Sequence, residues 1–104
     1  MAHQNLLIKE MMSICRTTIV ELHTEEDTDA MIADYIEHFD SMFPECELTL
    51  NSKVGPTTVI SNSVYANQVV IEKTGSGSRQ KFMDKHKDRM KEVTTFIGEV
   101  TFSK

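Results

Sequence analysis

Residues 14–23, ICRTTIVELH, decide between two folds for this chain. Side chains spaced three and four residues apart run through this stretch and predict a helix from about residue 4 to residue 22. They are Leu7, Met11, Ile14, Thr18 and Leu22. The same stretch holds four consecutive β-branched residues, 17–20, which favour a strand over roughly residues 14–23. The helix is the leading prediction, and the strand stays open as the alternative.

A second helix is predicted directly after this stretch. Thr24 or Thr28 can cap its first turn, and the acidic residues within 25–29 suit the positive end of the helix dipole. A stripe of apolar side chains at helical spacing follows, made up of Met31, Ile32, Tyr35, Ile36, Phe39, Met42 and Phe43. Pro44 ends the helix, because proline disfavours the helical conformation in the residue before it.

The pattern changes to strands from Cys46 onward. Residues 47–50 and 57–60 are predicted strands, and the Val-Gly-Pro turn at 54–56 joins them into a hairpin. Residues 68–73 contain a third β-branched run, which ends before Gly75. These three runs predict an antiparallel sheet.

A third helix is predicted from Ser78 to at least Val93. Its helical register comprises Phe82, His86, Met90, Val93, Ile97 and Val100. Residues 96–102 also favour a strand, and Gly98 suits either the end of the helix or the start of a short final strand. His86 falls on the apolar register, where we expect a partly buried, structural imidazole.

The leading fold class is α+β: a single domain, residues 1–104, with about three helices packed on a small three-stranded antiparallel sheet in the order α-α-β-β-β-α. If residues 14–23 and 96–102 are both strands, the order becomes strand-helix-strands-helix-strand, a split βαβ or ferredoxin-like arrangement. The chain has 104 residues, of which 39% are hydrophobic and 26% charged. This composition is typical of a globular domain with one core.

The start of the sequence lacks the basic residues and the long apolar stretch of a secretory signal, and no segment is apolar enough to span a membrane. Cys15 and Cys46 are too few for a disulfide framework. We therefore expect two reduced thiols in a cytoplasmic protein.

Charge is segregated along the chain. Residues 17–52 carry ten carboxylates and no Lys or Arg, whereas residues 73–91 carry seven Lys and Arg against two Asp. Such asymmetry is typical of proteins whose surfaces meet charged partners. We therefore predict a small inhibitor, adaptor or regulator that binds a protein partner and also pairs with copies of itself. The predicted partner-binding residues lie on the polar side of the second helix: Asp29, Asp34, Glu37 and Asp40.

The alternative is a protein that binds or sequesters a phosphorylated small molecule or nucleotide. Glycines let backbone amides converge, and a helix N-terminus attracts anions. The candidate ligand-binding residues open the last predicted helix: Gly75, Ser76, Gly77, Ser78, Arg79 and Lys81. Their spacing matches neither of the glycine-rich nucleotide motifs, so an ordinary loop that leads into a capped helix is the competing interpretation.

Nucleic-acid binding by the basic C-terminal helix is the third hypothesis, and the net charge of −5 counts against it. The sequence holds no nucleophile-and-base motif and no paired metal-ligand spacing. We therefore predict no catalytic residues, no metal, no cofactor and no enzymatic activity.

Overall fold

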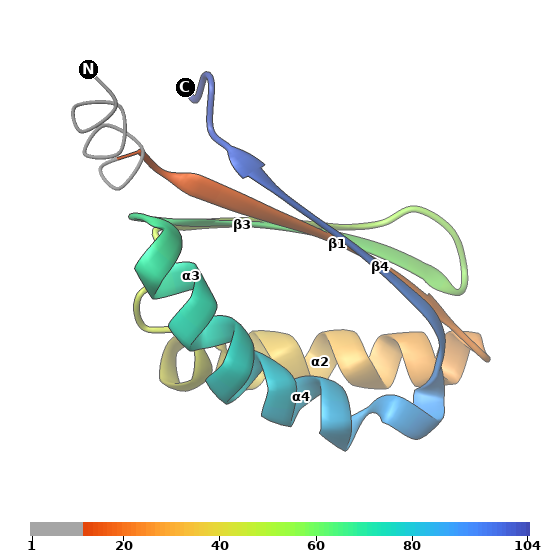
Figure 1. The fold of residues 1–104 in the computed structure, drawn as a ribbon. Coiled ribbons are helices and arrows are strands. Elements are labelled where there is room, and N and C mark those ends of the chain that lie inside the picture. The colour runs from red at the N-terminus through yellow and green to blue at the C-terminus, as the bar shows by residue number, and fades with distance from the viewer. Residues whose placement is uncertain (1–11) are drawn as a thin grey trace, which may run out of the picture.

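The computed structural model describes residues 12–104, which form one four-stranded sheet with helices packed against it (Figure 1). The strands are β1 (Ile14–Leu22), β2 (Leu48–Lys53), β3 (Thr58–Tyr65) and β4 (Met90–Glu99), and the helices are α2 (Glu25–Met42), α3 (Gln68–Thr74) and α4 (Gln80–Lys85). Residues Gly75–Arg79, which we call the π-helical turn, join α3 to α4 across a kink at Gly77, whose backbone is not helical (φ −101°, ψ −108°). A 3₁₀ turn, Lys87–Arg89, precedes β4.

The sheet is antiparallel throughout, with the strand order β2-β3-β1-β4. In Figure 1, α2, α3 and α4 all lie on one face of the sheet, which we call the inner face. The other, outer face carries none of the described helices. The split βαβ alternative is therefore confirmed, and the order α-α-β-β-β-α with three strands is wrong.

Residues 14–22 form a strand, so the predicted helix over this stretch is wrong. Burial alternates along β1, with every second side chain from Ile14 to Leu22 buried and the side chains between them half-buried. Two neighbours, β3 and β4, pair with the backbone of this β-branched stretch along nearly its whole length, which a helix of the same residues cannot match. The part of the predicted helix before residue 12 lies outside the described residues.

The second helix is confirmed as α2. The Thr24 side chain accepts a hydrogen bond of 3.0 Å from the backbone N–H of Asp27, which caps the first turn. At the other end the Phe43 N–H donates to the Phe39 carbonyl, and Pro44 follows. The N-cap, the apolar stripe and the proline that ends the helix all lie within this one segment, which is why the sequence predicts α2 well.

Residues 68–73, predicted as a strand, form most of α3 instead. The Asn67 side chain accepts a 3.0 Å hydrogen bond from the Val70 N–H, and this cap starts the helix. Ile71 is then buried against Ile14 and Tyr65 of the sheet. The cap and this burial outweigh the strand preference of a short β-branched run.

The last predicted helix is too long. Helix α4 ends at Lys85, and residues 90–99 form β4, which pairs with β1 from Leu22↔Met90 to Ile14↔Glu99. The β-branched residues within 93–97 favour this strand, and pairing with the central strand fixes it. Among the described residues, no helix is long and apolar enough to cross a membrane.

Candidate functional site

A cavity of about 450 Å³ lies between α2 and the inner face of the sheet. Its helical wall consists of apolar side chains from α2 and α4: Met31, Ile32, Tyr35, Ile36, Phe39, Phe43, Phe82 and Met83. Its sheet wall combines the apolar or aromatic residues Val20, Val59 and Tyr65 with the polar residues Arg16, Thr18, Thr49, Asn51, Ser52, Lys53, Ser61 and Ser63. Arg79 enters from the π-helical turn. The cavity is therefore apolar on the helix side and mixed on the sheet side.

Aromatic rings make up much of the helical wall. The Tyr35 ring centroid lies 5.3 Å from that of Phe39 and 5.6 Å from that of Phe82, and the second pair packs edge to face. These are residues of the apolar stripes, which the sequence predicts as core. Part of the apolar stripe of α2 therefore lines the cavity instead of a packed core. Ile36, one of the lining residues, is 71% exposed. A flat apolar molecule would replace water against these rings at a gain in free energy.

Hydroxyl groups gather on the sheet wall because the strands are in register. Thr18 of β1 faces Ser61 of β3, and Thr49 of β2 faces Ser63. The Tyr35 hydroxyl hydrogen-bonds to Thr49 Oγ1 at 3.2 Å, which links α2 to this wall. These groups can orient a ligand through hydrogen bonds without adding charge.

Three cationic side chains line the cavity. Lys53 is paired with Glu25 and Asp29, so Arg16 and Arg79 supply the positive charge that is left without a carboxylate partner in the described residues. Arg16 is 6% exposed and donates from Nη2 to the Ile71 carbonyl at 2.8 Å, with its guanidinium 5.7 Å from the centre of the Tyr65 ring. Arg79 donates from Nη2 to Thr18 Oγ1 at 3.3 Å and to Thr95 Oγ1 at 3.1 Å. Burial lowers the pKa of both guanidinium groups, and the positive charge of Arg16 lowers the pKa of Arg79 further.

No carboxylate compensates these two charges within residues 12–104. The ion pairs formed there include neither Arg16 nor Arg79. Asp40 lines the cavity from α2, but it is exposed to solvent and pairs with neither arginine. The cavity is therefore cationic.

The structure separates the residues of the predicted anion site. Gly75, Ser76, Gly77 and Ser78 belong to the π-helical turn rather than to an open loop, and Arg79 points from that turn into the cavity. Lys81 is exposed and lines a smaller depression that Asp34 and Lys85 also border. Gly75 serves a different purpose from the one expected: a Cβ at this position would lie 2.8 Å from Arg16 Nη2, so the glycine leaves room for that guanidinium.

The four acidic residues of the predicted partner-binding face have different surroundings. Asp29 is paired with Lys53 at 2.9 Å, Asp34 is turned toward α4, Glu37 is exposed, and Asp40 borders the cavity.

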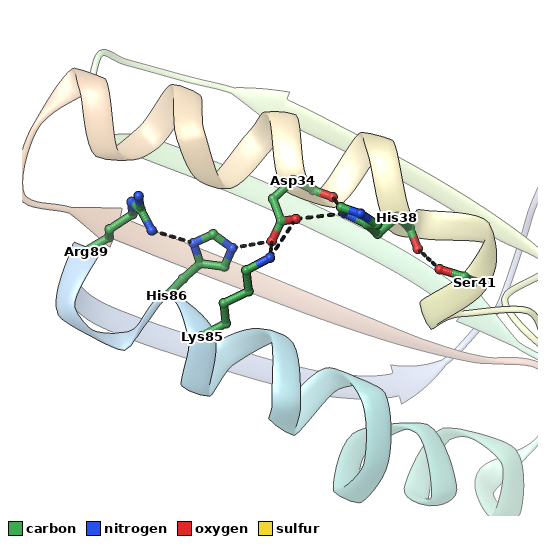
Figure 2. Close-up of polar contacts among 6 residues, drawn as sticks. All are labelled: Asp34, His38, Ser41, Lys85, His86 and Arg89. Carbon is green, nitrogen blue, oxygen red and sulfur yellow. Dashed lines mark hydrogen bonds and ion pairs between the residues drawn. The ribbon is translucent and has the colours of Figure 1, made fainter.

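Asp34 connects α2 to α4 and to the turn before β4 (Figure 2). His86 donates from Nε2 to Asp34 Oδ2 at 2.6 Å, Lys85 Nζ lies 3.0 Å from the same carboxylate, and His38 Nδ1 lies 2.8 Å from Oδ1. The hydrogen bond from His86, with those from Lys85 and His38, lowers the pKa of Asp34 to about 2.

His86 is 2% exposed, which confirms the predicted structural imidazole. Its Nδ1 lies 3.3 Å from Arg89 Nη1, which can only donate, so Nδ1 acts as the acceptor and Nε2 carries the proton toward Asp34. His86 does not line the cavity, and Phe82 separates the two, with its ring centroid 4.7 Å from the imidazole. The network around Asp34 therefore holds elements together rather than contacting a ligand in the cavity.

Within the described part of the chain, no three His, Cys, Asp or Glu side chains lie close enough together to hold a metal ion. The cavity residues that the sequence analysis missed are Arg16 and the hydroxyls of the sheet wall. An arginine at an inward position of an alternating strand is an unusual residue, and recognising β1 as a strand would have identified it.

No family model matches this chain, and no curated protein matches it in sequence. Solved structures do share its fold. A candidate antibiotic biosynthesis monooxygenase from Caulobacter crescentus has a TM-score of 0.70 and 12% identity, over 98% of this chain and 100% of its own. A mutant of SnoaB, a cofactor-independent oxygenase from Streptomyces nogalater, has a TM-score of 0.68 and 5% identity, over 88% of this chain and 95% of its own. A dimeric ferredoxin-like protein from an uncultured marine organism has a TM-score of 0.70 and 11% identity, over 91% of this chain and 93% of its own. Identities this low establish a shared fold and no shared activity.

These comparisons correct the predicted function. The prediction of a regulator that binds a protein through an acidic helix face is contradicted, because several solved structures of the same fold are described as oxygenases or candidate monooxygenases. The prediction of a protein without enzymatic activity is contradicted by the same descriptions, which are those of the neighbours and assign no activity to this chain. The alternative of a bound small molecule agrees better with the cavity, although the cavity lies beside the loop proposed from the sequence rather than in it.

Proposed function

We propose that this protein binds a small organic molecule in the cavity between α2 and the sheet and acts on it as an enzyme. The observation that carries the proposal is the cavity itself. Its volume of about 450 Å³ falls within the range of about 300–1,000 Å³ that is typical of small-molecule sites. Its largely apolar wall and its few converging polar groups are also typical of such sites.

The reaction that we propose is an oxygenation in which one atom of molecular oxygen enters the substrate and the other leaves as water, with two hydrogen atoms that the substrate gives up, so the substrate itself supplies the electrons. Its support is the likeness in fold to SnoaB, described as a cofactor-independent oxygenase, and to candidate monooxygenases. A screen of small aromatic compounds by thermal shift, followed by oxygen-electrode measurements on each stabilising compound, tests both parts. Stabilisation without oxygen uptake would support binding and contradict the oxygenase activity, and a screen without any stabilising compound would contradict both.

Filling the cavity is expected to abolish binding without unfolding the protein. Ser61 lies on β3 and lines the cavity, so a phenylalanine in Ser61→Phe places its ring in space that a ligand needs. A ligand at about 100 times its Kd stabilises the native state by about 2.7 kcal/mol, and the variant is expected to lose this shift.

The matched control for this variant is Ser76→Phe, which places the same side chain at an exposed position of the π-helical turn, away from the cavity. It is expected to keep the ligand-induced thermal shift of the wild type. An equal loss in both variants, or an undiminished shift in Ser61→Phe, would place the binding site elsewhere.

We further propose that two copies pair through the outer face of the sheet. Leu48, Leu50 and Phe96 alternate to this face and are between 55% and 66% exposed. Leu50 and Phe96 lie on the two edge strands of this face, with Asn62 and Thr17 between them. Exposed apolar side chains on one face support an interaction surface. The dimeric ferredoxin-like protein of the same fold supports a homodimer.

A charge on this face is expected to separate the two copies. Phe96→Glu would bury a carboxylate in the proposed interface, and analytical ultracentrifugation is expected to show a shift from dimer toward monomer. The control is Phe102→Glu, which adds the same charge at a side chain that is 84% exposed and lies beyond β4. A wild-type protein that sediments as a monomer at micromolar concentration would contradict the proposal.

A further inference from the structure

The charges of Arg16 and Arg79 act on the same part of the cavity. Arg16 and Thr18 occupy inward positions two residues apart on β1, and Arg79 donates a hydrogen bond to Thr18. The influence of the Arg16 charge on Arg79 agrees with this proximity. Two like charges therefore lie close together in a partly buried space, with no protein carboxylate paired with either one in residues 12–104.

Such an arrangement is costly unless something compensates it, because an unpaired charge loses solvation when it is buried. Each guanidinium has five N–H donors. In the described residues Arg16 uses Nη2 for the Ile71 carbonyl, and Arg79 uses Nη2 for two threonine hydroxyls. The remaining donors are available to a ligand, and the planar fork of a guanidinium matches the two oxygens of a carboxylate.

The rest of the cavity limits the size and charge of that ligand. Its helical wall is apolar and aromatic, so the body of the ligand must be apolar too. A phosphate dianion costs more to desolvate than a carboxylate, and Lys81, which would have helped to bind it, lies outside the cavity. One negative charge on a flat ring system fits these walls better than a nucleotide does.

We propose that the cavity selects an aromatic carboxylate, with its carboxylate between Arg16 and Arg79 and its ring against Tyr35, Phe39 and Phe82. This inference rests on the proposed function, since it names the class of molecule that the same cavity binds. It also assigns Arg79 as the residue that sets specificity for charge, and Gly75 as the position that lets Arg16 reach the site.

Three probes of the same shape test this assignment: 2-naphthoate, the neutral 2-naphthamide and 2-naphthyl phosphate, each titrated by calorimetry into the full-length protein. The carboxylate is expected to bind at least about tenfold more tightly than the amide, as hydrogen bonds between charged groups imply. Arg79→Met is expected to remove this preference, and Lys81→Met, which deletes a neighbouring charge outside the cavity, is expected to keep it.

Each outcome bears on a separate claim. Equal binding of the carboxylate and the amide would overturn the assignment and leave the proposed small-molecule site intact. Tighter binding of the phosphate would overturn it in favour of a phosphorylated ligand. Binding of none of the three probes would also overturn the assignment, while the proposed function is decided by the wider compound screen and Ser61→Phe.

If Arg79→Met does not fold, Arg79→Lys retains the positive charge without the planar guanidinium. This variant is expected to weaken the preference for the carboxylate over the amide, and an unchanged preference would contradict the role of Arg79.

Discussion

Phe82→Ala is expected to destabilise the native protein by about 3–5 kcal/mol, the usual cost of removing a buried aromatic ring. Phe82 is 6% exposed and belongs to the cluster of Val20, Leu22 and Met31. Its ring also packs against Tyr35 on the cavity side and His86 on the other. Truncation therefore leaves a void between the cavity and the Asp34 network. Urea denaturation followed by circular dichroism measures the change in the free energy of unfolding.

Phe102→Ala is the matched control, because that ring is 84% exposed. A surface truncation of this kind is expected to change the free energy of unfolding by no more than about 0.5 kcal/mol. If Phe82→Ala costs less than about 1 kcal/mol, α4 does not pack on α2 and the sheet as described.

Acidification is expected to remove a stabilisation that Asp34 provides at neutral pH. The folded-state pKa of about 2 lies below the ordinary value of 3.8, so the unfolded chain binds the proton more readily than the native protein does. Stability from this group is fully present above about pH 4 and is lost as the pH falls toward 2. The lowered pKa corresponds to about 2 kcal/mol at neutral pH.

Asp34→Asn is expected to lose about 2 kcal/mol of stability at neutral pH and to show a weaker dependence on pH below 4. Part of the loss arises because His86, which is 2% exposed, then faces an amide in place of a carboxylate. Glu37→Gln is the matched control: it neutralises another carboxylate of α2, one that is exposed and forms no ion pair in the described residues. Identical acid-denaturation midpoints for Asp34→Asn and the wild type would show that Asp34 does not link α2 to α4.

The sequence predicts those elements whose determinants lie close together in the chain. For α2, the cap at Thr24, the apolar stripe and Pro44 occur within one segment. For β1 the decisive factor is remote, because β3 and β4 lie far along the chain and stabilise a strand where the local spacing also allows a helix. The same holds for α3, where burial of Ile71 against the sheet overrides a β-branched run.

The cavity could not be predicted from the sequence, because its residues also lie far apart in the chain. Its residues come from β1, α2, β2, β3, the π-helical turn and α4, and no short motif joins them. Arg79 was identified as a ligand-binding candidate from its place after two glycines, yet its direction into the cavity follows from hydrogen bonds to Thr18 and Thr95 on two neighbouring strands. Charge segregation along the chain does not predict how these residues pair in the fold. Asp29 forms an ion pair with Lys53 of β2, and Asp34 forms one with Lys85 of α4.

The central position of β1 has a consequence for how the protein is made. The first described strand pairs along its whole length with the last, from Leu22↔Met90 to Ile14↔Glu99. During synthesis, one edge of β1 therefore stays uncovered until residues 90–99 have left the ribosome. Such distant pairings slow folding, because the long intervening loop must close first. Thr95, which helps to orient Arg79, belongs to β4, so Arg79 reaches its position in the cavity only after residues 90–99 have been synthesised and have paired with β1.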